Sequence, residues 1–395
     1  MRLEDICTVF TDGDWIESKD QSEEGIRLVQ TGNIGEGIYL EKESRAKYIS
    51  EETFKRMKCT EIFPGDILVS RLPDPVGRAC IVPEKKERMV TAVDCTICRP
   101  NKSLISKEYM CYFMRSNAYY TRLMGNIKGA TRKRISRKNL GNIELNVPSK
   151  EEQLRGVKQL DCLTKVINSR RKEIELLDNL IKARFVEMFG DPQINPFGWA
   201  VVNISEVVGG KVSNGFFAKR DDYVDDGNVS ILGVANIVNR MYSKVDGLPK
   251  TDADDKDIEK YEVRYGDILF CRSSLVAEGI GKASIIPENV QDKVLFECHV
   301  IRLPLDLNRC VPEFIQTLST TDFFRNQVIA QSKTATMTTI GQEGILKTDI
   351  ILPPVDKQRE FYDFVKQVNK SKAVVQKSLD ETQVLFDSLM QKYFG

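Results

Sequence analysis

Two stretches of the chain carry hydrophobic residues at every third or fourth position, one within residues 151–190 and the other within 356–395. Neither contains a proline, and this spacing gathers apolar side chains on one face of a helix. The first stripe comprises Leu160, Leu163, Ile167, Ile174, Leu177 and Ile181, and the second comprises Val365, Val368, Val375, Leu379, Phe386 and Leu389. Because the stripes persist over several heptads, we predict two long helices that pair as an antiparallel coiled coil. Two ordinary core helices are the alternative.

The segments before these stretches contain short apolar runs broken by Gly, Asn, Asp and Pro, which is typical of strands and turns. In both segments a Gly-Asp-Ile-Leu sequence reads as a turn that leads into a buried strand, at residues 65–68 and 266–269. Further strands are expected over residues 91–98 and 295–303, and helices over 107–123 and 312–329. Each segment is therefore predicted to form a mixed α/β (α+β) domain.

The chain repeats itself once. Residues 64–71 recur as 265–272, residues 77–84 as 281–288, residues 128–131 as 333–336 and residues 187–190 as 392–395, with offsets of 201 to 205. A period this long indicates a tandem of whole domains instead of a solenoid. We therefore expect a first α/β domain at 1–149, a helix at 150–190, a second α/β domain at 191–354 and a final helix at 355–395.

Composition excludes several classes of protein. With 395 residues, of which 41% are hydrophobic, the chain can bury a full core. It has no apolar window long enough for a membrane span, and residues 1–5 do not begin a signal peptide, so a cytoplasmic protein is expected. The ten cysteines are then mostly reduced and buried; Cys95 and Cys98 form a C-x-x-C that we interpret as core thiols in a strand, with a metal site as the alternative. The only histidine, His299, is interpreted as a strand residue, which leaves little room for histidine-dependent catalysis.

The net charge of +1 does not favour nucleic acid, so any DNA-binding surface must be a local patch. Residues 128–138 are such a patch, with six basic residues in eleven and no acid. The matching segment 331–339 carries one charge and five hydroxyls, so the two segments would read different sequences. The candidate DNA contacts there are Lys128, Thr131, Arg132, Lys133, Arg134, Arg137, Lys138, Lys333, Thr334, Thr336 and Thr338. A solvated basic face is the alternative.

Weaker candidates for DNA contact are Arg71, Arg78, Lys219, Arg220, Arg272 and Ser273, for each of which a structural salt bridge is an equal alternative. Catalytic motifs are poor: the chain lacks a phosphate-binding G-x-x-x-x-G-K-[ST] loop and a G-x-G-x-x-G sequence. Asp74, Glu84 and Lys86 have the order of a Mg²⁺-dependent nuclease site, and they define an enzymatic alternative. A coiled-coil scaffold is the third hypothesis.

The duplicated plan resembles the specificity subunits of Type I restriction–modification systems, over essentially the whole length. The resemblance is carried by the repeat, the two long helices, the loop at 129–131 and the two junctions, Pro148-Ser149-Lys150-Glu151-Glu152-Gln153 and Pro353-Pro354-Val355-Asp356-Lys357-Gln358. The family's junction resembles Pro-Pro-Leu-x-Glu-Gln, from which this chain departs at Ser149 and Lys357.

The resemblance implies that each α/β domain is a target-recognition domain reading half of a split site in double-stranded DNA. It further implies that the coiled coil is a ruler that docks two methyltransferase subunits, and that motor-nuclease subunits join through the complex. S-adenosylmethionine, ATP and Mg²⁺ would belong to those partners. This chain would then hold no cofactor, no metal and no catalytic residue of its own.

Overall fold

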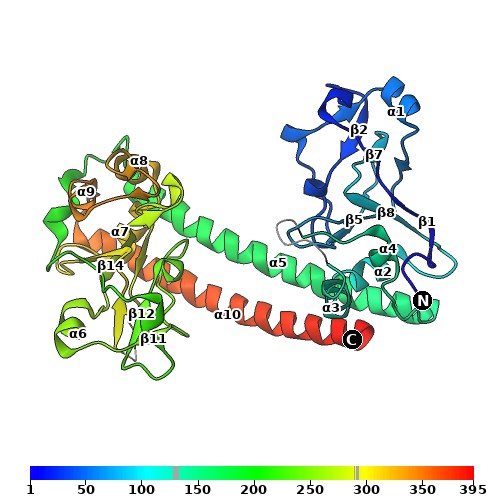
Figure 1. Ribbon diagram of the computed structural model, residues 1–395. Helices are drawn as coiled ribbons and strands as arrows, with labels where there is room; N and C mark the ends of the chain where they lie inside the picture. The colour runs from blue at the N-terminus through cyan, green and yellow to red at the C-terminus, as the bar shows by residue number, and fades with distance from the viewer. Residues whose placement is uncertain (128–132, 289, 291–292) are drawn as a thin grey trace. The chain divides into compact units, whose positions relative to one another are not determined.

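The computed structural model describes residues 1–127, 133–288, 290 and 293–395 (Figure 1). The chain divides into two compact units that are not continuous in sequence. Unit 1 comprises Met1–Arg171 and Gln376–Gly395, and unit 2 comprises Lys172–Val375. Each unit therefore contains one α/β domain together with part of both long helices.

Unit 1 contains two four-stranded sheets. The antiparallel sheet has the order β1 (Cys7–Asp12), β8 (Cys95–Pro100), β5 (Ile67–Ser70) and β6 (Ala79–Ile81). The mixed sheet has the order β3 (Tyr48–Ile49), β2 (Ile26–Val29), β7 (Met89–Thr91) and β4 (Glu61–Ile62), in which β2 and β7 are parallel. The Gly-Asp-Ile-Leu sequence leads into β5, whose four residues are all buried, as predicted.

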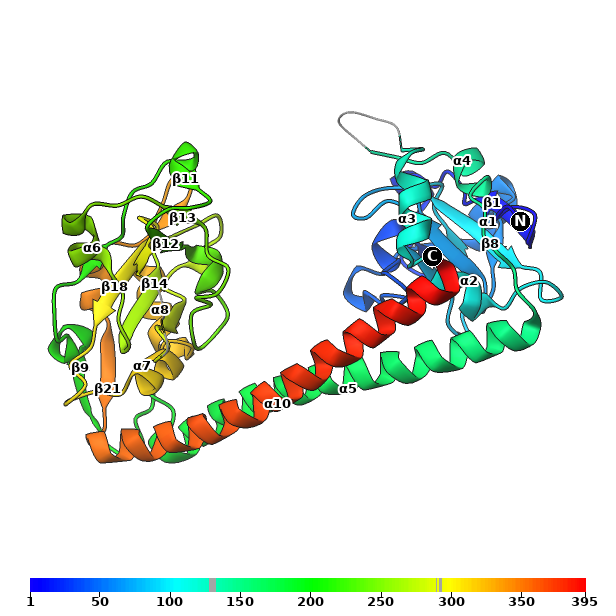
Figure 2. The ribbon, with the colours of Figure 1, turned by 90° about the horizontal axis from the view of Figure 1, so that it is seen from below.

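The core of unit 1 is arranged in layers. Leu68 and Ile97 of one sheet pack against Val29 and Met89 of the other. Helix α1 (Glu51–Met57) covers the far side of the mixed sheet. The far side of the antiparallel sheet is covered by α2 (Lys107–Phe113) and α3 (Asn117–Met124), which in turn pack on the two long helices, as Figure 2 shows.

Unit 2 repeats this plan. Its antiparallel sheet has the order β10 (Ser213–Asn214), β18 (Val300–Pro304), β14 (Asp267–Cys271) and β16 (Ala283–Ile285). Its mixed sheet has the order β11 (Tyr223–Val224), β13 (Lys250–Thr251), β12 (Val229–Leu232) and β17 (Val294–Phe296). The covering helices are α6 (Asp255–Tyr261), α7 (Pro312–Leu318) and α8 (Asp322–Ala330). A two-stranded sheet pairs β9 (Ala200–Asn203) with β21 (Asp349–Leu352).

The predicted duplication is visible in the element boundaries. Helices α2 and α7 begin 205 residues apart, and so do α3 and α8, as well as α4 (Arg137–Gly141) and α9 (Gln342–Leu346). Two glycines occupy matching places: a Cβ on Gly13 would lie 2.3 Å from the Thr91 carbonyl oxygen, and one on Gly215 would lie 2.2 Å from the Phe296 carbonyl oxygen. Only glycine allows the two backbones to approach so closely.

The two predicted long helices are present and pack together. They are α5 (Lys150–Phe189) and α10 (Val355–Phe394), each of 40 residues (Figures 1 and 2). In unit 1, Leu160 near the start of α5 shares a core with Phe394 at the end of α10. In unit 2, Phe185 near the end of α5 packs on Phe361 near the start of α10, with ring centroids 5.6 Å apart. The helices are therefore antiparallel.

The stripe residues differ in burial. Those that are buried are Leu160, Ile167, Ile181, Val365, Val368, Val375 and Phe386, and those that are partly buried are Leu163, Ile174, Leu177, Leu379 and Leu389. The shared apolar faces of the helices thus continue into the cores of both units.

The junctions into the long helices have a physical explanation. Gln153 accepts a hydrogen bond from the Ser106 N–H (2.9 Å) and donates to the Leu104 and Pro148 carbonyl oxygens. At the position 205 residues later, Gln358 accepts from the Val311 N–H (2.9 Å) and donates to the Pro353 carbonyl oxygen (2.8 Å). Both side chains are buried. Each glutamine thus satisfies backbone groups at the point where helix, domain and linker meet.

Four predicted elements are each divided in the structure. The run 91–98 supplies β7 and β8, and 295–303 supplies β17 and β18, because the chain turns at residues 92–94 and 297–299 to cross from one sheet to the other. The predicted helix 107–123 is α2 and α3, and 312–329 is α7 and α8. Ser116 and Thr321 begin the second helix of each pair by capping its N-terminus, accepting from the N–H of Tyr119 (3.2 Å) and Phe324 (3.4 Å).

Cys95 and Cys98 lie buried in β8 as free thiols, in agreement with their interpretation as core residues. The interpretation of His299 was wrong: it lies exposed in the turn before β18. In the described part of the chain, no helix has both the length and the apolar character needed to cross a lipid bilayer.

Candidate nucleic-acid interface

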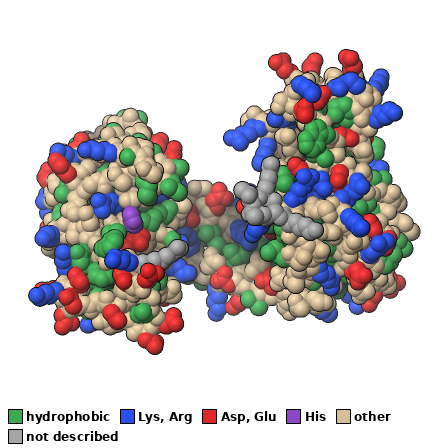
Figure 3. Space-filling view, in the orientation of Figure 1, with side chains coloured by type: hydrophobic (Ala, Val, Ile, Leu, Met, Phe, Trp, Pro, Cys, Tyr) green, Lys and Arg blue, Asp and Glu red, His purple; other side chains and the backbone are tan. Residues whose placement is uncertain are grey.

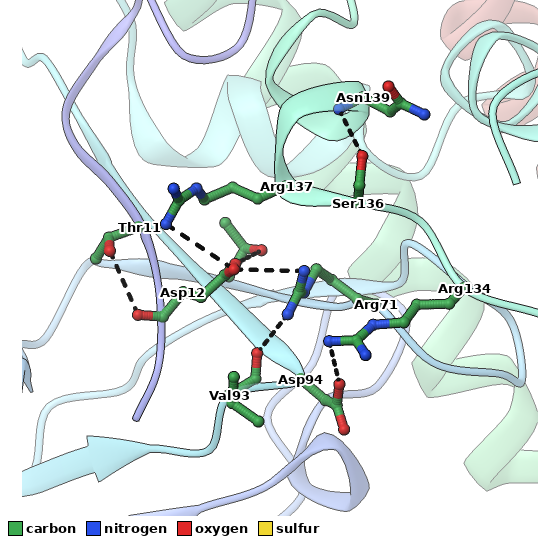
Figure 4. Close-up of polar contacts among 10 residues, drawn as sticks. Thr11, Asp12, Arg71, Val93, Asp94, Arg134, Ser136, Arg137 and Asn139 are labelled. Carbon is green, nitrogen blue, oxygen red and sulfur yellow. Dashed lines mark hydrogen bonds and ion pairs between the residues drawn. The ribbon is translucent and has the colours of Figure 1, made fainter. Parts of the chain in front are cut away.

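In unit 1 the basic residues after position 132 lie beside the carboxyl ends of β1 and β5. Ile135 is fully buried, and its N–H points to the Arg71 carbonyl oxygen (3.4 Å). Ser136 then caps α4 by accepting from the Asn139 N–H (3.1 Å). This anchored segment brings Arg134 and Arg137 next to Arg71, at the end of β5 (Figure 4).

Asp12, the last residue of β1, is the centre of this cluster. Its Oδ1 atom accepts from the Thr96 hydroxyl (3.0 Å), and its Oδ2 atom lies 3.3 Å from Arg71 Nη1 and 3.9 Å from Arg137 Nη1. One carboxylate therefore faces two guanidinium groups (Figure 4).

Arg71 is held inside the protein. Its side chain is only 6% exposed, and Nη2 donates to the Val93 carbonyl oxygen (2.7 Å). Burial lowers the pKa of Arg71, an effect that the negative charge of Asp12 opposes. This geometry makes Arg71 a residue that fixes the turn between β7 and β8.

The neighbouring basic side chains are exposed. Arg134 pairs with Asp94 (2.8 Å), and its side chain is 44% exposed. The side chain of Arg137 is 49% exposed, and Lys133 and Lys138 are exposed without an ion pair among the described residues. A hollow of about 420 Å³ is lined by Glu4, Phe10, Asp12, Arg71, Arg137 and Lys138. Because the acids neutralise only some of these cations, the surface can attract phosphates.

The face of unit 1 in Figure 3 carries many Lys and Arg side chains with Asp and Glu among them. This mixture agrees with the near-zero net charge of the chain. The positive character is local, as the sequence predicted.

Unit 2 has the same scaffold with different side chains. Arg272 donates to the Cys298 carbonyl oxygen (3.1 Å), and the Ile340 N–H donates to the Arg272 carbonyl oxygen (3.0 Å). These contacts match those of Arg71 and Ile135 in unit 1. The matching scaffold indicates that the polar segments after β5 and β14 occupy equivalent places.

The charged pair of unit 1 is replaced by a neutral pair. Asn214, opposite Ile301 in β18, matches Asp12, which is opposite Thr96 in β8. Gln342 lies 205 residues after Arg137. When its amide is oriented to satisfy its surroundings, Gln342 accepts from the Asn214 N–H (3.1 Å) and donates to the Val212 carbonyl oxygen (3.2 Å). The same contact is therefore ionic in one unit and made by amide groups in the other.

The hydroxyl-rich segment of unit 2 forms a hairpin. Strands β19 (Lys333–Thr334) and β20 (Thr338–Thr339) pair with each other, and β20 also pairs with β15 (Ser273–Ser274). Lys333, Thr334 and Thr336 are exposed, whereas Thr338 is buried with its hydroxyl 3.0 Å from that of Thr334. The tip of the hairpin can therefore reach a ligand, and the side chain of Thr338 supports it.

The other candidate residues lie elsewhere or deeper. Arg78 is buried, and its guanidinium donates to the carbonyl oxygens of Thr31, Ile34, Leu72 and Pro75 at 2.7–3.0 Å. Ser273 is buried in β15. Lys219 is exposed beside Asp222, whose carboxylate accepts from its N–H (2.6 Å). Lys128, Thr131 and Arg132 lie outside the described residues, as does the side chain of Arg220.

The nuclease alternative needs carboxylates that converge on a metal ion. Asp74 and Glu84 are exposed. Over residues 1–127, 133–288, 290 and 293–395, no three His, Cys, Asp or Glu side chains gather closely enough to hold a metal. The described residues thus offer no centre for Mg²⁺-assisted hydrolysis.

Sequence reasoning missed Asp12, Asp94, Asn214 and Gln342. A signal for Gln342 was present, because the 205-residue offset places it at the position of Arg137. The match between Asp12 and Asn214 follows from the glycine after each, Gly13 and Gly215. Asp94 had no comparable signal, because its contact with Arg134 depends on the turn between two sheets.

Known proteins similar to this chain share one description. The family described as Type I restriction modification DNA specificity domain matches residues 1–177 and 196–382. The Type I restriction enzyme StySPI specificity subunit of Salmonella potsdam is 25% identical over 313 residues, covering 75% of this chain and 65% of that protein. The EcoKI specificity subunit of Escherichia coli is 22% identical over 322 residues, covering 75% and 66%. The matches thus span about two thirds of the length of these relatives.

The fold has a counterpart among solved structures. The Type-I restriction-modification system S subunit from M. genitalium superposes with a TM-score of 0.55, over 100% of this chain and 95% of that one. The identity between them is 11%, so this likeness concerns the fold alone.

Proposed function

We propose, from the premise that this chain belongs to the family of Type I restriction–modification DNA specificity proteins, that it is the subunit that selects the DNA sequence. In this proposal each unit reads one half of a split site in double-stranded DNA. The chain contributes no catalytic residue and no cofactor of its own.

The observation that carries the proposal is a common scaffold with different side chains at matched positions. Asp12 and Arg137 in unit 1 correspond to Asn214 and Gln342 in unit 2. A protein that bound DNA only through its charge would not need this divergence. A reader of two different half-sites does need it, because sequence is distinguished by the donors and acceptors that face the base edges.

The chemistry of each surface supports a different kind of contact. Lys133 and Lys138 suit phosphates, and Arg134 or Arg137 can also donate twice to the edge of guanine. In unit 2, Gln342 carries an amide that can pair with adenine, and Thr336 offers a hydroxyl at the tip of the hairpin. Unit 1 would therefore depend more strongly on salt than unit 2.

Partner subunits are also part of the proposal. Both long helices expose apolar side chains, among them Leu154, Leu176 and Leu180 of α5 and Val374, Val384 and Leu385 of α10, each 47–70% exposed. Exposed apolar residues along paired helices suit a protein partner. We infer that two methyltransferase subunits dock there and that motor-nuclease subunits join through the complex. S-adenosylmethionine, ATP and Mg²⁺ would bind to those subunits.

The test is a selection of bound sequences from randomised duplexes, with and without a methyltransferase partner. The protein should select a bipartite site and should gain affinity from the partner. Arg137→Ala should relax only one half-site and Gln342→Ala only the other, each by about 1–3 kcal/mol of discrimination. Lys133→Ala should weaken all sequences alike and lower the slope of log K against log salt by about 1.

Three results would contradict the proposal. A preference for one continuous site would remove the two-part reading. Unaltered binding by all three variants would favour a scaffold protein. Mg²⁺-dependent cleavage by the purified chain, lost on Asp74→Ala, would favour the nuclease alternative.

A further inference from the structure

Unit 2 contains a basic hollow that lies apart from the residues assigned to DNA. Its volume is about 630 Å³, and it lies where α5 and α10 meet α7 and α8. Five basic residues line it, namely Lys182, Arg240, Lys282, Arg325 and Lys372, and the one acidic residue among its lining is Asp178.

Most of this positive charge is not neutralised. Lys372 forms an ion pair with Asp178, and Lys282 donates to the side-chain oxygen of Asn239 (2.6 Å). Lys182 and Arg240 are exposed and have no ion pair among the described residues. Because like charges in one concavity repel each other, the site favours an anion that replaces this repulsion with attraction.

Two buried groups at the hollow lack a partner. Thr317 is 3% exposed, and its Oγ1 atom has no hydrogen-bond partner within the described chain. The same holds for Nη1 of Arg325, although Nη2 of that residue donates to the Glu278 carbonyl oxygen (3.0 Å). A buried donor without an acceptor costs about 1–3 kcal/mol. An oxygen-rich anion would supply the missing acceptors.

The hollow has no open equivalent at the matching place in unit 1, where larger side chains stand. Tyr112, Met114 and Arg115 occupy the positions of Thr317, Ser319 and Thr320, 205 residues earlier. The Arg115 guanidinium lies 5.1 Å from the centre of the Tyr112 ring and 5.8 Å from that of Phe386. Phe386 itself matches Ile181, which lines the hollow. The open space is thus a specific feature of unit 2 and not a consequence of the shared fold.

The charges at the matched positions differ as well. Lys182, Lys372 and Arg325 correspond to Asp387, Ile167 and Tyr120 in unit 1. One of these three unit 1 positions is acidic and the other two are uncharged. Both the space and the positive charge are therefore confined to unit 2.

We propose that this hollow binds a phosphate-bearing ligand of nucleotide size. Its volume falls in the range of small-molecule sites, about 300–1,000 Å³. The phosphates would lie against Lys182, Arg325 and the Thr317 hydroxyl. Met241, Tyr242 and Ile181 provide an apolar and aromatic surface for the remainder of the ligand. This site is separate from the DNA contacts proposed above and does not depend on them.

The experiment is a calorimetric titration of the full chain at about 150 mM salt with pyrophosphate, with ATP and with a short DNA duplex. Lys182→Glu and Arg240→Glu change exposed residues at the hollow, so the protein should remain folded. Each is expected to weaken pyrophosphate and ATP binding about tenfold, through loss of one charge-assisted contact. Lys165→Glu, an exposed residue of α5 in unit 1, is the matched control and should leave both affinities unchanged.

A second variant tests the space instead of the charge. Thr320→Tyr adds bulk at an exposed position of the lining, and it should weaken ATP more than pyrophosphate, with the melting temperature as the control for folding. The proposal is wrong if neither phosphate compound binds saturably, or if their affinities ignore both charge variants. If only duplex binding responds, the hollow belongs to the DNA surface and the small-ligand assignment is wrong.

Discussion

Glu313 is a single residue whose charge opposes folding. It is fully buried in α7, where one carboxylate oxygen accepts from the Tyr242 hydroxyl (2.9 Å) and the other lacks a partner within the described chain. Burial raises the pKa of Glu313 above its ordinary value of 4.5, and the hydrogen bond from Tyr242 only partly opposes this. The folded state therefore holds this proton more tightly than the unfolded state does.

The sign of the resulting pH dependence follows from that difference. As the pH rises from about 4.5 through the raised folded pKa, the contribution of Glu313 to stability falls. Glu313→Gln removes the charge, so the variant should be more stable than the parent at about pH 8 and equal to it near pH 4. Urea unfolding at both pH values measures the difference. Glu108→Gln, at the matched exposed-side position of α2, should show no such gain; equal pH dependence in the parent and the Glu313 variant would refute the argument.

Gln358 makes the opposite kind of contribution, because its hydrogen bonds satisfy buried backbone groups. Gln358→Met keeps the side-chain shape and leaves the Val311 N–H and the Pro353 carbonyl without their partner. We expect a loss of about 2–4 kcal/mol in the free energy of unfolding, measured in urea. Gln367→Met, at an exposed position on the same helix, is the control; a loss below about 0.5 kcal/mol for Gln358→Met would contradict this role.

Individual roles were only partly predictable from the sequence. Gln153 and Gln358 could be found because they recur within a duplicated junction. Arg78 could not be distinguished from a DNA-binding arginine, because its four carbonyl partners lie in segments that are far apart in the sequence. Burial of this kind depends on tertiary structure, which local pattern does not contain.

At the scale of elements, long periodic helices were predicted well and short buried strands less well. The 3–4 spacing located α5 and α10 to within two residues at each end. The runs 91–98 and 295–303 were each read as one strand, because an apolar run does not reveal that the chain changes sheets within it. The hairpin β19–β20 was also not predicted, since its threonine-rich sequence lacks an apolar alternation.

The long helices carry the element-scale prediction. Seven residues inserted into α5 after Arg171 and into α10 after Val375 keep the apolar stripes in phase and lengthen each helix by about 10 Å. The preferred spacer between half-sites should then grow by about three base pairs, at about 3.4 Å each. Site selection from randomised duplexes measures the spacer. An insertion in α5 alone, which puts the faces out of register, should instead abolish selection; an unchanged spacer in the double insertion would exclude a ruler role.

At the scale of the whole molecule, the duplication explains most of what was predictable. The offset of 205 residues relates four helix pairs, two buried glutamines and two anchoring isoleucines. What distinguishes the two copies was less visible, because the exchange of Asp12 and Arg137 for Asn214 and Gln342 has meaning only once the contacts are known. The shared positions specify the fold, and the differing positions are the candidates for function.

The most direct test of two-part recognition is to make the two readers identical. The bridge between Arg2 and Glu144 matches the pairing of Asn203 with Asp349, so residues 202–354 can be replaced by a second copy of residues 1–149. Bound sequences are then selected from randomised duplexes, with the native chain in parallel and a methyltransferase partner present. The proposal predicts a site composed of two copies of the native half-site that Arg137 reads. Retention of the native site, or loss of the second half-site without replacement, would contradict it.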